Sequence, residues 1–185
     1  PNGSLDPIMP KDNYVKLNNL FGTYFSKNLD SIGSLYFTKE AFDGTYPGYG
    51  SSYPDLQGGL GLLFEQASSR GLKQKTKYGY ITFPFTIRNQ FVSSLATVQA
   101  AVENKSLLRK YQKDFFKSAM ERSAKSKIKA YAFTEPDQNK NKAFIDKLLQ
   151  HKVEVIKTAE NSFAVPTQQP QYRMVQTFFE TYENY

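Results

Sequence analysis

Residues 59–71 read GLGLLFEQASSRG. Five of the six residues from Leu60 to Glu65 are apolar or glycine. Such a run is short for a helix and typical of a strand buried on both faces. The run ends at Glu65, and burying a carboxylate costs several kcal/mol unless a cation, a metal or hydrogen bonds compensate it. We therefore predict a buried strand with Glu65 at its end, as a candidate catalytic residue.

A glycine-rich aromatic loop lies directly upstream of this strand. Residues 44–59 read GTYPGYGSSYPDLQGG and carry Tyr46, Tyr49 and Tyr53. Tyrosines on such a loop either pack their rings together or act on a substrate beside Glu65. Glu65 itself is either a general base or a carboxylate satisfied by Arg70 or by a backbone amide.

Together these segments resemble the zinc carboxypeptidase family, typified by carboxypeptidase A. The similarity is to divergent bacterial members that read approximately YPGYGSS, PDLQG and LFEQASSRG, as this chain does from Tyr46 onward, and it covers residues 12–127. The resemblance implies that Glu65 is the general base and that Tyr46 is the mobile tyrosine, with Tyr49 as the competing assignment. Arg70 opens a basic cluster after the strand and is a candidate for binding an anionic substrate group.

The chain departs from this family in its metal ligands. The family places a His-x-x-Glu pair and a further histidine ahead of the glutamate, whereas this chain has one histidine, His151. A catalytic zinc needs three protein ligands, so we expect no zinc on this chain and a zinc site supplied by a missing N-terminal half. His151 and Glu154 do spell His-x-x-Glu, but in the wrong order along the chain. A histidine at a helix C-terminus that favours the dipole is the preferred interpretation.

The resemblance therefore implies a hydrolase that cleaves C-terminal peptide or peptide-like amide bonds, of which these residues are an inactive fragment. It also implies export to the periplasm, the surface or the medium. The alternative is a non-catalytic carboxypeptidase-like module that binds peptide, glycan or a partner protein. The upstream sequence would separate the two, because only the enzyme needs the zinc ligands.

Composition excludes several other classes of function. The chain of 185 residues has no cysteine, so thiolate metal sites, disulfides and cysteine nucleophiles are absent. No apolar run reaches the length that spans a bilayer. The net charge of +7 invites a nucleic-acid interpretation. We expect no nucleic-acid binding, because the lysines over residues 105–129 occupy the solvent faces of a helix and do not alternate with aromatic residues.

The predicted fold class is α/β, with the C-terminal part of a carboxypeptidase-like mixed-sheet domain over residues 1–127 and a small βαβ module over 128–185. A first helix runs from Asp12 to Gly33, followed by a short strand over 34–38. A long helix lies within residues 80–104. Its apolar stripe is predicted to be core, because that spacing packs a helix on a sheet; the stripe consists of Ile87, Phe91, Leu95, Val98 and Val102.

In the second module, strands over 128–133 and 153–157 flank a helix that starts at Pro136 and Asp137. They are predicted to run parallel, joined by a right-handed crossover. A third strand covers 162–166. The segment that follows, PTQQPQYR over residues 166–173, either hydrogen-bonds a partner or is a loop and helix start fixed by its two prolines.

Overall fold

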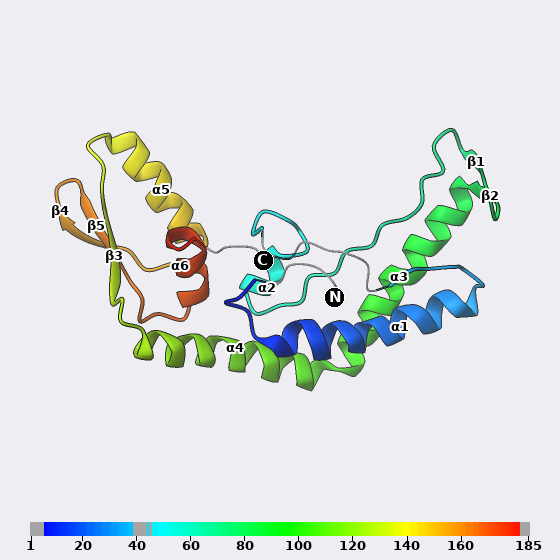
Figure 1. Ribbon diagram of the computed structural model, residues 1–185, viewed down its shortest axis with the longest axis horizontal. Coiled ribbons are helices and arrows are strands. Elements are labelled where there is room, and N and C mark those ends of the chain that lie inside the picture. Colours follow the sequence, from blue (N-terminus) through cyan, green and yellow to red (C-terminus); the bar gives the residue numbers. More distant parts are fainter. Residues whose placement is uncertain (1–5, 39–43, 45, 182–185) are drawn as a thin grey trace.

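The computed structural model describes residues 6–38, 44 and 46–181. Its elements form an open crescent (Figure 1). A three-stranded sheet with two helices lies at one end, and two long helices with a β-hairpin lie at the other. Helix α4 (Lys105–Lys125) runs along the lower edge, and the short helix α2 (Tyr53–Leu56) sits in the middle. The helices and small antiparallel sheets agree with a general α/β class.

The first helix begins and ends where the sequence predicts. A π-helical turn, η1 (Asn13–Leu17), continues into α1 (Asn18–Ser31). Gly33 follows with φ +64°, and the Ser34 N–H donates to the Leu29 carbonyl. This is a glycine-terminated helix end of the Schellman type. The strand predicted over 34–38 is wrong: Ser34 belongs to the helix end, and the described residues supply no sheet partner for the rest.

Helix α3 (Phe83–Glu103) packs on α1 through small side chains. Ala96 and Ala100 are buried against Phe21 and Phe25, because a helix surface of alanines lets its neighbour approach closely. The Thr82 hydroxyl accepts from the Phe85 N–H and caps the helix start. The opposite face of α3 carries the apolar stripe.

The prediction that this stripe is core is wrong. Its five side chains are between 51% and 68% exposed, namely Ile87, Phe91, Leu95, Val98 and Val102. The apolar spacing predicted that the stripe would be buried, whereas the described residues pack on the opposite face, which carries small and polar side chains. They leave the apolar stripe exposed.

A hairpin precedes α3 and was not predicted. Strands β1 (Lys73–Thr76) and β2 (Gly79–Thr82) pair antiparallel, with Lys73 opposite Thr82. Gly79 has φ +118°, a backbone conformation that favours glycine. The sequence signal for this hairpin is weak, because its two loop residues, Lys77 and Tyr78, are not a typical hairpin turn pair.

The C-terminal sheet combines strands β3 (Ala130–Thr134), β4 (Ile156–Ala159) and β5 (Ser162–Pro166) in the order β3-β5-β4. Helix α5 (Gln138–Gln150) links β3 to β4, and Asp137 caps it by accepting from the Asn139 N–H at 2.8 Å. Strands β3 and β4 run in the same direction, because each is antiparallel to β5. In a simple βαβ unit these two strands would be neighbours. Here the chain turns tightly after β4, and β5 lies between β3 and β4. The unit is a split βαβ.

Helix α6 (Tyr172–Phe179) closes the main core. This core takes residues from both sides of the predicted boundary at 127/128, including Leu56 and Phe115 on one side and Leu148, Val165 and Val175 on the other. None of the helices in the described ranges has both the length and the hydropathy that crossing a membrane requires.

Candidate functional site

The segment over residues 60–69 is extended but belongs to no strand, so the predicted buried strand is wrong in its pairing. Leu60 and Leu62 pack against the core between α1 and α3, and the Phe64 ring meets Phe25 edge-on at 4.4 Å. Exposure does not alternate along the segment as it would in a strand, since Leu63, Phe64 and Glu65 are all exposed. No backbone-to-backbone hydrogen bond within the described residues involves this segment.

Glu65 is exposed. The sequence predicted a compensated, buried carboxylate, and this expectation is wrong because the described residues place no sheet around the segment. Arg70 does not neutralise Glu65. Four ion pairs join described residues, and in each the two exposed partners lie one helical turn apart. Neither Glu65 nor Arg70 takes part in any of them.

The tyrosine loop contacts the same extended segment at Gly61. The Gly61 N–H donates to an Asp55 carboxylate oxygen at 2.9 Å. A Cβ on Gly61 would lie 1.7 Å from the Ser51 carbonyl oxygen, so only glycine permits this approach. The loop therefore contacts this segment at Gly61, four residues before the exposed Glu65.

Tyr46 and Tyr49 pack on each other at the surface of this loop. Their ring centroids are 4.9 Å apart in an edge-on arrangement, and both side chains are about half exposed. The structure therefore brings the two candidate tyrosines together and leaves both accessible. It gives no preference for one of them as the residue that closes on a substrate.

Arg70 lies at the turn into the β-hairpin and is exposed. Its peptide N–H is held by the Ser68 hydroxyl and its carbonyl accepts from the Gln74 amide. The next basic residue, Lys73, lies over the Tyr80 ring at 4.2 Å. The cluster is thus fixed by its backbone and presents its charges to solvent.

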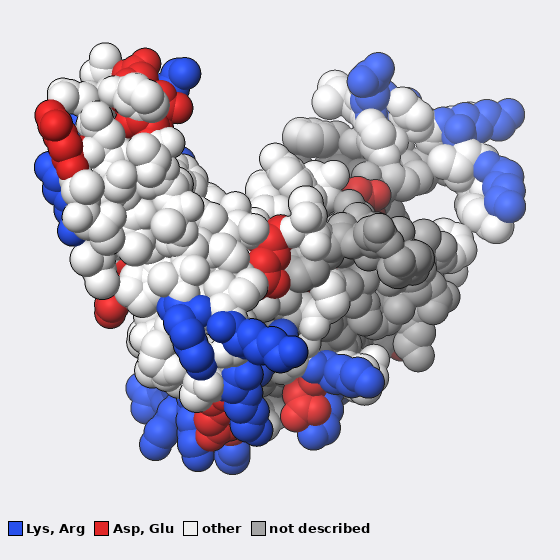
Figure 2. Space-filling view, turned by 60° about the vertical axis from the view of Figure 1, so that its left-hand side comes forward, with Lys and Arg blue, Asp and Glu red and all other residues white. Residues whose placement is uncertain are grey.

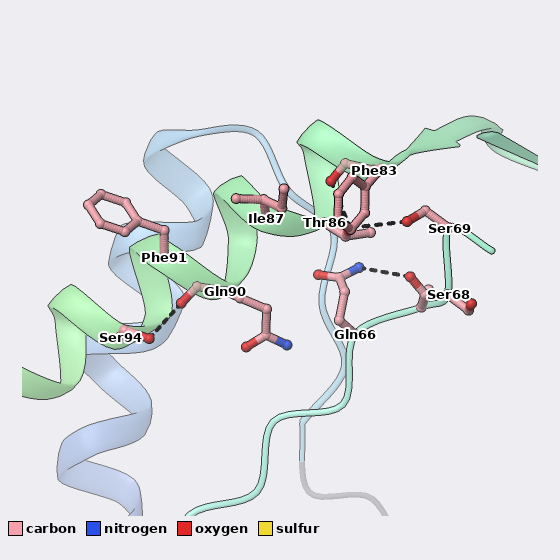
Figure 3. A pocket seen from close by; sticks show the side chains of 10 residues that line it. Gln66, Ser68, Ser69, Phe83, Thr86, Ile87, Gln90, Phe91 and Ser94 are labelled. Carbon is pink, nitrogen blue, oxygen red and sulfur yellow. Dashed lines mark hydrogen bonds between the residues drawn. The ribbon is translucent and has the colours of Figure 1, made fainter. Parts of the chain in front are cut away.

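A shallow groove of about 500 Å³ runs between the extended segment and α3 (Figure 3). The Ser69 and Thr86 hydroxyls, 3.1 Å apart, join its two sides at one end. Its α3 wall is apolar, with Phe83, Ile87 and Phe91 about half exposed or more. Its other wall is short and polar. The groove begins one residue after Glu65, at Gln66.

His151 ends helix α5 and contacts the tyrosine loop. Its Nδ1 lies 2.9 Å from the Tyr53 hydroxyl. Burial, and then the charge of Lys147, lower the pKa of the His151 ring. The predicted interaction with the helix dipole needs the protonated ring, which this environment disfavours. Within the described residues, no group of three or more metal-ligating side chains could hold a metal ion.

The segment PTQQPQYR has a structural role, which is one of the two interpretations that the sequence left open. The Arg173 guanidinium is buried and donates to the Ile8 carbonyl at 2.9 Å, the Phe115 carbonyl at 2.6 Å and the Ser118 hydroxyl at 3.0 Å. Burial lowers the Arg173 pKa to about 10. The Gln169 amide accepts from the Glu154 N–H at 2.7 Å and donates to the Pro166 carbonyl. These side chains are therefore occupied within the fold.

The basic residues of α4 face solvent, as predicted. Figure 2 shows Lys and Arg side chains along the lower edge of the molecule, where this helix runs, and at the hairpin end. The helix buries Phe115, Ala119 and Ser123 on its other face. Several of its charges are held in pairs one turn apart, such as Lys110 with Asp114.

No family model, curated protein or solved structure matches this chain.

Proposed function

We propose that this chain carries the general base of a zinc carboxypeptidase-like hydrolase, and that this base is Glu65. The intact enzyme would cleave C-terminal peptide or peptide-like amide bonds, and this chain would form the C-terminal part of its catalytic domain. The proposal rests on the resemblance of residues 46–71 to that family. The observation that carries it is the exposed Glu65 carboxylate, which lacks an ion pair among the described residues and follows, by four residues, the contact of the tyrosine loop with Gly61.

In this role Glu65 would accept a proton from the attacking water and deliver it to the leaving amine. General acid–base catalysis by one positioned group contributes about a hundred- to ten-thousand-fold. Tyr46 or Tyr49 would close over the bound substrate, and Arg70 would attract its terminal carboxylate. The residues of this chain do not fit a zinc site, since it has a single histidine, so no step at the metal is assigned to them.

The experiment is a kinetic comparison in the full-length protein with zinc present. Glu65→Gln keeps the size of the side chain but removes its basicity, and should lower kcat for release of a C-terminal amino acid by about a hundred- to ten-thousand-fold. Glu160→Gln is the matched control, because Glu160 is an exposed carboxylate in the turn between β4 and β5. Unchanged turnover in Glu65→Gln would remove this residue from the mechanism.

A non-catalytic module that binds peptide, glycan or a partner protein is the second candidate. The uncovered apolar face of α3 favours it, because exposed apolar surface of this extent marks interaction sites. Full-length protein that releases no C-terminal amino acid in the presence of zinc, yet binds a peptide, would establish this function instead.

A further inference from the structure

A block of positive charge without opposing carboxylates follows Glu65. From Gln66 to Val102 the sequence contains five basic residues and no acidic one. Four of the five are exposed on or beside the β-hairpin, and no ion pair between described residues involves them. Figure 2 shows these positive side chains at the hairpin end of the molecule. We call this group the hairpin cluster, which consists of Arg70, Lys73, Lys75 and Lys77.

The lysines of α4 show what a solvated basic surface looks like in this protein. Lys110 pairs with Asp114 and Lys117 pairs with Glu121, each one helical turn away. Such pairs balance the charge of a helix face with carboxylates of its own. The hairpin cluster has no such carboxylate among the described residues, so its field is available to attract an anionic partner.

Strand pairing gathers the cluster on one face of the hairpin. Lys73 and Lys75 are alternate residues of β1, and Tyr80 of β2 lies directly opposite Lys75. Alternate residues of a strand, and residues directly opposite each other, share a face of the sheet. All three are exposed, whereas Gln74 and Ile81 on the other face are partly buried. The charges repeat about every 7 Å, which is also the repeat of alternate side chains in an extended peptide.

Two tyrosine rings hold ammonium groups of the cluster. Lys73 Nζ lies 4.2 Å from the centroid of the Tyr80 ring, and Lys77 Nζ lies 4.7 Å from that of Tyr78. These contacts are cation–π interactions, which position a charge without neutralising it. A carboxylate can approach such an ammonium group from the solvent, whereas a nucleic-acid base that stacks on the ring competes with it. The arrangement therefore favours acidic side chains over bases.

The cluster begins close to the proposed general base. Arg70 follows Glu65 by five residues, and residues 66–69 between them line the groove along α3 (Figure 3). The Ser69 hydroxyl lies 3.1 Å from the Thr86 hydroxyl, which fixes on α3 the backbone that leads into Arg70. Five residues span at most about 18 Å. A peptide held at Glu65 therefore has the residues near its C-terminus within reach of this charge.

We propose that the hairpin cluster recognises acidic side chains of the substrate, so that the preferred substrate is a peptide with several acidic residues close to its C-terminus. This inference rests on the proposed function, which supplies the peptide and its cleavage at the C-terminal end. It adds the chemical class of peptide that the site selects.

The first test measures binding by the 185-residue chain, which lacks zinc ligands and should leave the peptide intact. One fluorescent peptide ends in Glu-Ala-Glu-Ala-Glu-Ala, and its control has glutamine in place of each glutamate. In about 0.01 M salt the glutamate peptide should bind about threefold to a hundredfold more tightly, as three exposed ion pairs would give. The difference should disappear in about 1 M salt, where charges are screened beyond about 3 Å.

Two triple variants locate the surface. Lys73→Gln, Lys75→Gln and Lys77→Gln together should abolish the preference for the glutamate peptide. The matched control replaces three exposed lysines of α4, and so removes the same total charge, with Lys105→Gln, Lys113→Gln and Lys125→Gln. It should keep the preference. All six side chains are exposed, so far-UV circular dichroism should stay as in the wild type.

The full-length protein with zinc separates this inference from the proposed function. Both peptides release the same alanine, so a higher kcat/KM for the glutamate peptide, mainly through a lower KM, would support both. Equal kcat/KM for the two peptides would overturn the charge preference and leave the hydrolase in place. Binding that prefers the glutamate peptide, with no release of alanine from either, would support recognition of acidic peptides and overturn the hydrolase.

Three binding results would also overturn the inference. Equal affinity of the 185-residue chain for the two peptides would show that the cluster does not select charge. A preference that survives in the hairpin variant would place the recognition elsewhere. A single-stranded oligonucleotide of equal charge that binds more tightly than the glutamate peptide, and loses affinity in the hairpin variant, would assign the cluster to nucleic acid.

Discussion

The sheet end and the helical end of this molecule place apolar and polar side chains in opposite ways. At the sheet end, Leu148, Val165 and Val175 are completely buried, and the polar groups buried with them, such as Arg173, are hydrogen-bonded. At the helical end, α3 buries its small and polar face and exposes its large apolar one. The first region satisfies its own packing requirements. In the second region, the described residues cover one face of α3 and leave its large apolar face exposed.

This difference shows that apolar periodicity indicates which faces can be buried, but not what buries them. Helix α3 meets α1 through Ala96 and Ala100, where the aromatic rings of α1 fit closely. The described residues leave the larger apolar stripe exposed. Three predictions break or sharpen this comparison, in order of decreasing effect.

Arg173→Ala should destabilise the sheet end most, by about 3–5 kcal/mol. The substitution leaves the buried carbonyls of Ile8 and Phe115 without donors and opens a cavity beside the Phe115 ring. Urea denaturation would measure the loss. Arg109→Ala is the control on the exposed face of α4 and should change stability by less than about 0.5 kcal/mol. A small loss for Arg173→Ala would show that this buried network is not what closes the sheet end.

Ala96→Leu and Leu95→Ala compare the two faces of α3 at adjacent positions. Ala96 is 1% exposed and Leu95 is 53% exposed. The larger side chain at position 96 should force α1 away and cost about 1–3 kcal/mol. The smaller one at position 95 should cost less than about 0.5 kcal/mol in the chain by itself. Thermal unfolding of both variants is the measurement, and equal losses would mean that the stripe is already covered.

His151 should give the smallest effect, as a dependence of stability on pH. Burial holds its pKa in the folded state below the ordinary value of 6.5, so the unfolded chain binds the proton more readily. This group therefore leaves stability unchanged above about pH 6.5. Stability decreases as the pH falls below 6.5, and it becomes constant again below the folded-state pKa. Denaturation of the wild type and of His151→Asn at pH 7.5 and about pH 5.5 would test this. A wild type that loses no more stability than the variant would exclude this ring as the cause.

The local features of this fold follow from particular residues and could be predicted. Gly33 ends the first helix, Asp137 caps α5, and β5 spans Ser162–Pro166 as the sequence indicates. Each of these depends on a few neighbouring residues, such as a cap, a turn or a short alternating run. The position of β5 between its neighbours was not predictable in this way, because strand order depends on contacts between residues that are distant in the sequence.

The candidate site shows the same difference between local features, which could be predicted, and contacts between distant residues, which could not. The sequence indicated that the tyrosine loop and the Glu65 segment belong together, and Gly61 brings the loop against that segment. It did not indicate that Glu65 would be exposed, since its burial required strands on either side that the described residues do not provide. The buried state of Arg173 was equally hidden, because its partners are carbonyl groups far away in the chain.

The sequence by itself determined the ends of the first helix, the start of α5 and the position of β5, and it identified Glu65 as a carboxylate that follows the tyrosine-rich loop. These depend on local energetics, which capping residues, glycine and apolar periodicity fix within a few positions. Only the tertiary structure decided which face of α3 is buried, that residues 60–69 pair with no strand among the described residues, and that Arg173 joins the N-terminal segment to α4. Such choices depend on contacts between distant residues, and the pattern of a single segment is compatible with more than one of them.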